Sequence, residues 1–377
     1  MASILFEPVR INGLKLENRI LRSATWEGMA DDEGRVTPQL TQLMCRLAEG
    51  GVGAIVTGHI YVDPRGQASP RQLGIHTDGH VEGLSEMTEA VHRSGGRIVA
   101  QLAHAGLWAD PSATGAPALA PSRMDGVGKA PQQTMGDADV QAVIEAFVRG
   151  AERAAAVGFD GIQLHAAHGY LLSQFLSPYF NRRTDRYGGT LENRTRIHRE
   201  ITAAARARLG AKFPILIKMN GRDCLEGGLQ TAEAAEAALS MAEGGLDAIE
   251  VSGGTGLSGR KNPIRTGIRE KADEAYFRDA AEAVKAKVSI PVILVGGIRS
   301  FSVAEDIVAC GSADLVSMSR PLIREPDLVR RWRDGDRRRA ACRSDSRCFV
   351  PARSGEGLRC VRTSGPPDSD HSGFSSR

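Results

Sequence analysis

The amino-acid sequence predicts an α/β fold in which eight parallel strands alternate with eight helices and close into a (β/α)8 TIM barrel. Short apolar runs alternate with amphipathic stretches from residue 18 onward, which is the pattern of repeated βα units around a parallel sheet. Eight such alternations favour a closed barrel over an open doubly wound sheet. An open dinucleotide-binding sheet would also carry a glycine-rich fingerprint after its first strand, and residues 20–26, ILRSATW, contain none.

A small β-hairpin is expected to precede the barrel. Residues 5–9 and 14–16 are short apolar segments, and the Asn12-Gly13 pair between them is typical of tight hairpin turns. A barrel needs a plug at its amino-terminal mouth, and we expect this hairpin to provide it.

The predicted strands and helices follow one another in regular order. The strands cover residues 20–24, 54–58, 97–102, 161–165, 215–219, 248–252, 292–295 and 314–318. The helices cover residues 39–49, 81–94, 139–156, 192–209, 232–243, 274–285, 302–309 and 326–333. Two connections are long: residues 107–138 after the third strand are a candidate lid, and residues 177–194 follow the fourth strand.

The chain is expected to divide near residue 335. Residues 1–335 would form the barrel domain, and residues 336–377 a C-terminal extension. Residues 363–377 are rich in Ser, Gly and Pro and are expected to be disordered. The arginines between residues 330 and 339 are interpreted as a solvated helix face rather than a nucleic-acid site.

Composition narrows the class of protein. Hydrophobic residues make up 41% of the chain and charged residues 25%, which is ordinary for a globular protein with a large core. No apolar run reaches the roughly 18 residues of a membrane span, and the N-terminus lacks the apolar centre of a signal peptide. Six cysteines in 377 residues do not make a disulfide framework. We therefore expect a cytoplasmic protein that acts on a small molecule, without nucleic-acid or membrane partners; a homo-oligomer is left open.

The fourth predicted strand ends in candidate catalytic groups. Because side chains alternate along a strand, His165 points to the opposite face from its apolar neighbours, and His168 and Tyr170 follow within a few residues. In a barrel the loops after the strands build the active face, so these three side chains are predicted to bind and protonate a polar substrate. The alternative is a polar strand end that only caps the barrel. The two histidines could also suit zinc, but no third ligand with a recognisable motif accompanies them.

The last two strands end in residues that suit a phosphate. Gly296 and Gly297 let the backbone approach a ligand closely and present its N–H groups, and Ser319-Arg320 adds a guanidinium. Barrels form phosphate sites from the loops after strands seven and eight, so the pair predicts phosphate binding.

Gln101 and Lys218 end the third and fifth strands and are expected to face the rest of the same ligand. An amide can donate to and accept from a pyrimidine edge, and an ammonium can stabilise negative charge on a reduced ring. The combination suggests flavin mononucleotide (FMN). The alternative for Lys218 is a cation that is simply paired with an acidic neighbour.

With these residues in place, the chain resembles the Old Yellow Enzyme family of FMN-dependent ene-reductases and NADH:flavin oxidoreductases. The match runs from Leu5 to Arg333, and its most specific parts are residues 165–178, HAAHGYLLSQFLSP, and 181–194, NRRTDRYGGTLENR. The resemblance implies that NAD(P)H reduces FMN and leaves, and that the flavin then passes hydride to an activated alkene.

The resemblance also implies a role for each site residue. His165 and His168 would bind the substrate oxygen, Tyr170 would supply a proton, and Trp26 would border the substrate. The implied FMN-binding residues are Ala24, Thr25, Gly58, Gln101, Lys218, Gly296, Gly297, Ser319 and Arg320.

Some positions depart from the family pattern. Trp26 stands where many members have Thr or Cys, Lys218 where Arg is frequent, and Leu107 where Arg is common. Relatives of trimethylamine dehydrogenase carry a [4Fe-4S] cluster on four cysteines after the barrel. The corresponding positions here are Cys342, Asp345, Cys348 and Cys360.

Because clusters normally use four thiolates, the motif is interpreted as a relic and no [4Fe-4S] cluster and no metal is predicted. Two alternatives to an ene-reductase remain at this point. One is an oxidative demethylase or dehydrogenase of the trimethylamine dehydrogenase type, and the other is a flavin-binding protein without turnover.

Overall fold

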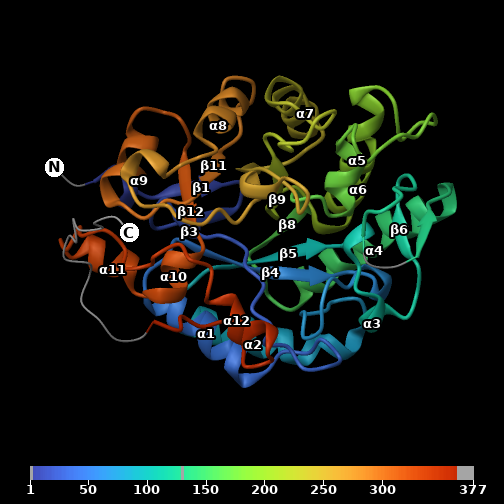
Figure 1. Ribbon diagram of the computed structural model, residues 1–377. Helices are drawn as coiled ribbons and strands as arrows, with labels where there is room; N and C mark the ends of the chain where they lie inside the picture. Colours follow the sequence, from blue (N-terminus) through green and yellow to red (C-terminus); the bar gives the residue numbers. More distant parts are fainter. Residues whose placement is uncertain (1–2, 129–130, 363–377) are drawn as a thin grey trace, which may run out of the picture.

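The computed structural model describes residues 3–128 and 131–362, and within them eight parallel strands close into a barrel (Figure 1). In chain order these are β3 (Ile20–Arg22), β4 (Ala54–Tyr61), β5 (Ile98–Ala103), β8 (Gly161–Ala166), β9 (Ile215–Asn220), β10 (Ala248–Ser252), β11 (Val292–Val295) and β12 (Leu315–Met318). The ring closes where β12 pairs with β3. The predicted barrel is confirmed.

Helices surround the barrel and bury their apolar faces against it (Figure 1). They are α1 (Pro38–Glu49), α2 (Val81–Arg93), α4 (Asp137–Ala156), α6 (Leu191–Leu209), α7 (Thr231–Glu243), α8 (Arg278–Lys285), α9 (Phe301–Ala309) and α11 (Leu328–Arg333). The helix predicted at 274–285 begins only at Arg278, because the chain before it follows the barrel mouth, where the Tyr276 N–H donates to the Gly296 carbonyl at 3.3 Å. Among the described residues, no helix is both long and apolar enough to cross a membrane.

The predicted N-terminal hairpin is present and closes one end of the barrel. Strands β1 (Val9–Ile11) and β2 (Leu14–Leu16) pair antiparallel, and Asn12 takes the positive φ of 50° that the tight turn requires. Ile11 and Leu16 are fully buried in a cluster with inward-facing strand residues such as Val99. The hairpin therefore fills the amino-terminal mouth.

The predicted long connections are partly regular. After β5 come η4 (Gly106–Trp108), α3 (Pro111–Thr114), β6 (Ala118–Ala120) and β7 (Gln132–Thr134), and α5 (Leu171–Leu176) follows β8. Short strands β6 and β7 pair with each other. These elements give the connection after the third barrel strand internal support.

The C-terminal residues up to 362 fold back over the barrel. After α10 (Arg320–Arg324) and α11 the chain returns, and α12 (Phe349–Arg353) lies near α10 and the barrel (Figure 1). The N–H of Leu358 donates to the Glu27 carbonyl at 2.8 Å, and the N–H of Ala340 to the Arg299 carbonyl at 2.9 Å. The division at residue 335 stays a prediction, and the tail predicted to be disordered, 363–377, lies outside the described residues.

The plug yields a test of stability. Ile11→Ala is expected to lower the free energy of unfolding by about 2–5 kcal/mol, because the residues around a fully buried side chain cannot fill the cavity that it leaves. Ile264→Ala removes the same atoms from a side chain that is 46% exposed, and should change the free energy of unfolding by less than about 0.5 kcal/mol. Urea denaturation followed by circular dichroism measures both; equal effects would contradict the packing of the plug.

Candidate functional site

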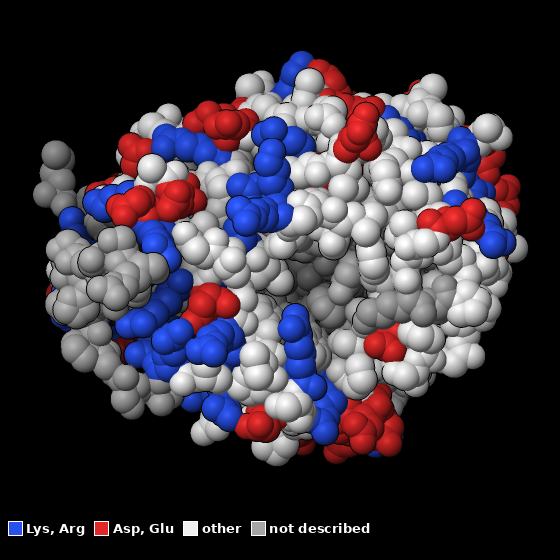
Figure 2. Space-filling model, in the orientation of Figure 1, with Lys and Arg blue, Asp and Glu red and all other residues white. Residues whose placement is uncertain are grey.

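One cavity of about 850 Å³ opens at the carboxyl ends of the barrel strands, and a hollow is visible at the centre of the face shown in Figure 2. It brings together residues from distant parts of the chain. The predicted site residues that line it are Ala24, Thr25, Trp26, Gln101, His165, His168, Tyr170, Lys218, Gly296, Gly297, Ser319 and Arg320.

Gly58 lies behind the cavity rather than in its wall. Its N–H donates to Glu27 Oε1 at 2.9 Å, and a Cβ at this position would come within 2.7 Å of the Thr25 carbonyl oxygen. The next residue, His59, lines the cavity instead. The register of β4 against β5 shifts between Val56 and His59, and such a shift changes which residue faces inward.

The candidate catalytic groups form a cluster of rings. His165 lies at the centre, with its ring centroid 5.3 Å from that of His168 and 4.8 Å from that of Tyr170. His59 joins them, 5.4 Å from Tyr170 and 6.3 Å from His165. His165 Nδ1 and His59 Nδ1 are buried and have no hydrogen-bond partner within the described chain. The cluster therefore keeps polar atoms free for a ligand.

His168 is held in an unusual backbone conformation. Its φ is 64°, in the left-handed region that residues other than glycine seldom adopt. The His168 N–H donates to Asn220 Oδ1 at 3.0 Å, and its Nε2 hydrogen-bonds Ser252 Oγ at 2.8 Å. Two neighbouring strand ends thus fix the backbone and the ring of this histidine.

The ring cluster is electrically neutral at neutral pH. Burial, with smaller contributions from neighbouring cations such as Lys218, lowers the pKa of His165 and of His168 well below the ordinary value. Burial likewise lowers the pKa of His59 to about 4 and raises the pKa of Tyr170 to about 12. The site can therefore donate hydrogen bonds without introducing an imidazolium or a phenolate.

Beneath the rings lies a buried polar network that includes two predicted residues. Lys218 Nζ donates to Ser23 Oγ at 2.7 Å and to Glu250 Oε1 at 3.2 Å. Gln101 Nε2 donates to Gln163 Oε1 at 2.7 Å. Lys218 therefore both lines the cavity and pairs with an acidic neighbour, so the two interpretations of Lys218 from the sequence, a ligand-facing cation and a paired cation, are compatible.

The opposite end of the cavity is cationic. Arg320 Nη1 donates to the Ser344 carbonyl at 3.3 Å and to Ser346 Oγ at 3.0 Å, and Arg299 Nη1 donates to the Ile268 carbonyl at 2.6 Å. Neither guanidinium forms an ion pair with a carboxylate of residues 3–128 or 131–362, so both charges are available to an anion.

Two glycines open the backbone beside these arginines. Gly297 has a φ of 72°, and a Cβ there would lie 2.7 Å from the Tyr276 ring. Ser319 Oγ hydrogen-bonds Thr25 Oγ1 at 2.6 Å, which joins the last strand end to the first. Glycine backbone, unpaired guanidinium groups, an amide and an ammonium in one cavity fit the phosphate and ring system of FMN.

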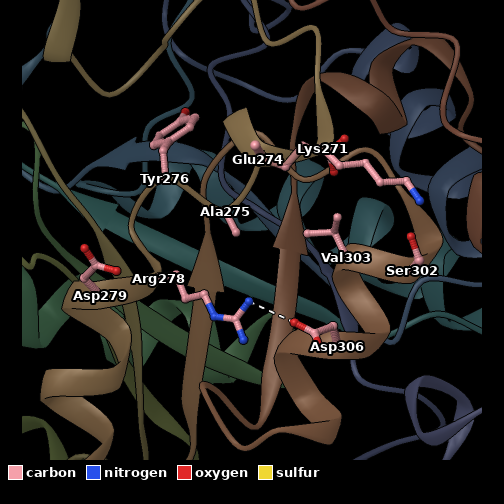
Figure 3. Close-up of a pocket in the computed structure, with 10 residues that line it drawn as sticks. Lys271, Glu274, Ala275, Tyr276, Arg278, Asp279, Ser302, Val303 and Asp306 are labelled. Carbon is pink, nitrogen blue, oxygen red and sulfur yellow. Dashed lines mark hydrogen bonds and ion pairs between the residues drawn. The ribbon is translucent and has the colours of Figure 1, made fainter.

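A second cavity of about 600 Å³ lies between α8 and α9, outside the barrel (Figure 3). Several of its charged groups are already matched: Arg278 Nη1 pairs with Asp306 Oδ2 at 2.9 Å, and the Glu274 carboxylate accepts the N–H groups of Arg299 and Ser300 at 2.8 Å. Glu274 therefore anchors the start of α9, and FMN phosphate would find no free cation pair here comparable to that in the main cavity.

The cysteine motif does not fit a four-thiolate cluster. Asp345 Oδ2 accepts from Arg362 Nε at 2.7 Å, and Cys360 Sγ contacts Arg324 Nη1 at 3.7 Å. No group of three or more His, Cys, Asp or Glu side chains is arranged to hold a metal ion within the described chain.

Sequence reasoning missed several residues of this site. His59 was hidden by the shift in strand register, and Ser344 and Ser346 by the expectation of a separate extension. Glu250 gave only a weak signal in the sequence, because it is an acidic residue between two apolar residues of a predicted strand. This pattern alone predicts no role for it.

Residues 4–338 match the family described as "NADH:flavin oxidoreductase / NADH oxidase family". The chain belongs to this family. The resemblance to Old Yellow Enzyme proteins is thereby confirmed over most of the chain.

The chain is also similar in sequence to proteins named as oxidoreductases. A "Metal reductase" from Desulforamulus reducens is 36% identical over 335 residues, which cover 88% of this chain and 49% of that protein. An "NADPH dehydrogenase" from Halalkalibacterium halodurans is 35% identical over 323 residues, covering 85% of this chain and 91% of that protein. The chain thus spans about half the length of some of these oxidoreductases, as the 49% share shows, and nearly all of others.

Two solved structures are similar to this chain in fold. A 2-naphthoyl-CoA reductase in complex with 2-naphthoyl-CoA has a TM-score of 0.87 and 25% identity, covering 96% of this chain and 57% of that one. An old yellow enzyme homologue from Zymomonas mobilis has a TM-score of 0.75 and 25% identity, covering 88% of this chain and 92% of that one.

The buried histidines give this family member a predicted dependence of stability on pH. The pKa of His59 is about 4 in the folded chain and near its ordinary value, about 6.5, when unfolded, so the unfolded state binds more protons in between. Stability should fall as the pH drops from about 6.5 towards 4, and His59 alone should cost about 2 kcal/mol at pH 5. Urea midpoints of the native chain and His59→Gln at pH 7 and pH 5 measure this, and an equal loss in both would contradict it.

Proposed function

We propose that this chain is an FMN-dependent NAD(P)H oxidoreductase that reduces the activated C=C bond of α,β-unsaturated carbonyl compounds. One observation carries the proposal: His165, His168 and Tyr170 converge over Lys218 in a cavity whose other end presents Arg320. A proton donor, two neutral hydrogen-bond donors and a phosphate-binding end are what this chemistry needs.

The chain's residues would hold FMN along the whole cavity. Gln101 and Lys218, which line the cavity, would bind the polar groups of the ring, and Ala24 and Thr25 would line it. The backbone of Gly296 and Gly297, with the Ser319 hydroxyl and the Arg320 guanidinium, would bind the phosphate. When bound, FMN would supply the transfer of hydride from NAD(P)H to the substrate.

The ring cluster would polarise and protonate the substrate. His165 and His168 donate hydrogen bonds to the carbonyl oxygen, and these bonds strengthen as negative charge develops on that oxygen in the transition state. Because both imidazoles are neutral, they stabilise this charge without losing a proton of their own to it. Ser252 orients His168, and Tyr170, protonated because of its raised pKa, delivers a proton to the α-carbon. Trp26 borders the substrate.

The comparisons support the class of reaction. Relatives named NADPH dehydrogenase favour NADPH as the reductant, and a structural relative binds an aromatic acyl-CoA, whose thioester carbonyl the two imidazoles of this chain could receive. All six cysteines are free, which agrees with a cytoplasmic location.

The proposed reaction is tested with the purified protein under anaerobic conditions. We expect a yellow protein whose visible absorption bleaches on addition of NADPH or NADH and returns when 2-cyclohexenone is added, with formation of cyclohexanone. A protein that takes up no FMN would contradict the flavin assignment. Bleaching without reoxidation by any enone or maleimide would contradict the assignment of ene-reduction.

The role of Tyr170 is tested with Tyr170→Phe. Loss of the phenol proton should slow reoxidation by the enone about 100-fold while leaving reduction by NADPH within about twofold, because only reduction of the enone needs the proton. Stopped-flow absorbance measures the two half-reactions separately. Tyr179→Phe removes a hydroxyl outside the cavity and should change neither rate; an equal loss in both half-reactions of Tyr170→Phe would show that it only supports the pocket.

A further inference from the structure

A buried carboxylate, that of Glu250, lies directly beneath the floor of the cavity. Glu250 is 1% exposed and projects from β10 into the barrel interior, opposite Lys218 of β9 in register. It does not line the cavity, but Ser23, Lys218 and Ser317 line it and all three contact this carboxylate or its immediate partners. Glu250 therefore reaches the site only through other residues.

Every contact of this carboxylate is with a donor. Glu250 Oε1 accepts from Ser23 Oγ at 2.7 Å, from Ser317 Oγ at 2.6 Å and from Lys218 Nζ at 3.2 Å. Glu250 Oε2 accepts from Gln163 Nε2 at 2.9 Å. The ammonium and these hydroxyl and amide donors lower the pKa of the carboxyl against the effect of burial, so it is ionised. A buried charge held this fully is fixed in position.

The Glu250 carboxylate balances the charge of Lys218 beneath the cavity. Among residues 3–128 and 131–362, Glu250 is the only carboxylate in an ion pair with Lys218, and both side chains are at most 4% exposed. With the pair intact, the charge beneath the cavity is close to zero. Without Glu250, a buried ammonium would face the ligand with its full charge, and in a poorly screened interior that charge would act strongly on a ring whose own charge changes.

The Glu250 carboxylate also fixes the orientation of the side-chain amides of Gln163 and Gln101. An ionised carboxylate only accepts, so Gln163 must turn its NH2 towards Glu250, and its oxygen then accepts from Gln101 Nε2 at 2.7 Å. Gln101 is thereby oriented with its NH2 directed into the network. Glu250 thus determines, through Gln163, which atom of Gln101 is left for a ligand.

We propose that Glu250 is a positioning residue of the flavin site: by cancelling the charge of Lys218 it sets how strongly the chain prefers reduced to oxidised FMN, and by orienting Gln101 it strengthens the binding of oxidised FMN. The inference rests on the proposed function, because it requires that FMN occupies the cavity. Reduced flavin carries more negative charge than oxidised flavin, so the paired ammonium favours the reduced form less than a free one would.

The test uses Glu250→Gln in the full chain, with FMN as the probe. The ratio of its affinities for reduced and oxidised FMN should rise about 10- to 100-fold, and tenfold corresponds to about 30 mV in the midpoint potential of a two-electron couple. Spectroscopic titration against a reference dye measures the potential, and fluorescence titration measures the affinity for oxidised FMN. A change of less than twofold in the ratio would overturn the proposal.

Two further variants separate the two effects. Gln163→Met breaks the amide relay without altering charge, so it should weaken binding of oxidised FMN several-fold and leave the ratio unchanged. Asp247→Asn also removes a carboxylate from an ion pair, with Arg206, but three residues earlier in the chain, at the amino end of β10, and should change neither quantity. A shift of the ratio in Asp247→Asn as large as that in Glu250→Gln would show a general effect of lost charge.

A second background keeps the inference testable if Glu250→Gln does not fold. Lys218→Met and the double variant Lys218→Met/Glu250→Gln are compared, since the double variant buries no unpaired charge. The ratio of the affinities for reduced and oxidised FMN should be at least tenfold higher in the double variant than in Lys218→Met. Equal ratios in the two variants would overturn the proposal. Failure of the native chain to bind FMN would instead contradict the proposed function, so the two failures are distinguishable.

Discussion

The hydrogen bonding between β12 and β3 is the constraint on which the rest of the structure depends, because it closes the ring of strands. In a closed parallel barrel all carboxyl ends meet at one mouth, so residues that are hundreds of positions apart become neighbours. The hydrogen bond between Thr25 and Ser319, and that between Lys218 and Ser23, exist only because of this closure. The hairpin fills the other mouth, and the cavity opens over the strand ends.

Most of the fold could be predicted from the sequence because parallel barrel strands are buried on both faces and appear as short apolar runs. The ends of these runs also contain His165, Lys218 and Arg320, all of which line the cavity. Gly58 was placed in the wall, but strict alternation fails where the register of β4 shifts, and His59 takes that place. A local shift of this kind leaves no periodic signal.

The remaining parts of the site depend on contacts over long separations in sequence. Glu250 and Ser23 are 227 positions apart in the sequence, so their hydrogen bond becomes visible only in the folded chain. Ser346 meets Arg320 because the chain returns after α11, and neither composition nor spacing predicts the direction of that return. The two glycines and Arg320 carried a local signal, whereas their neighbours from the C-terminal segment carried none.

The return of the C-terminal segment also has a consequence for the order in which the protein is made. The cationic end of the cavity needs Thr25 near the start of the chain and Ser344 and Ser346 near its end. While the chain is still being synthesised, the early strands emerge with half of a pocket and cannot retain a phosphate-bearing ligand there. The FMN that the proposed function assigns to this cavity would therefore bind only after the C-terminal segment has folded back, and would not be a nucleus around which the barrel forms.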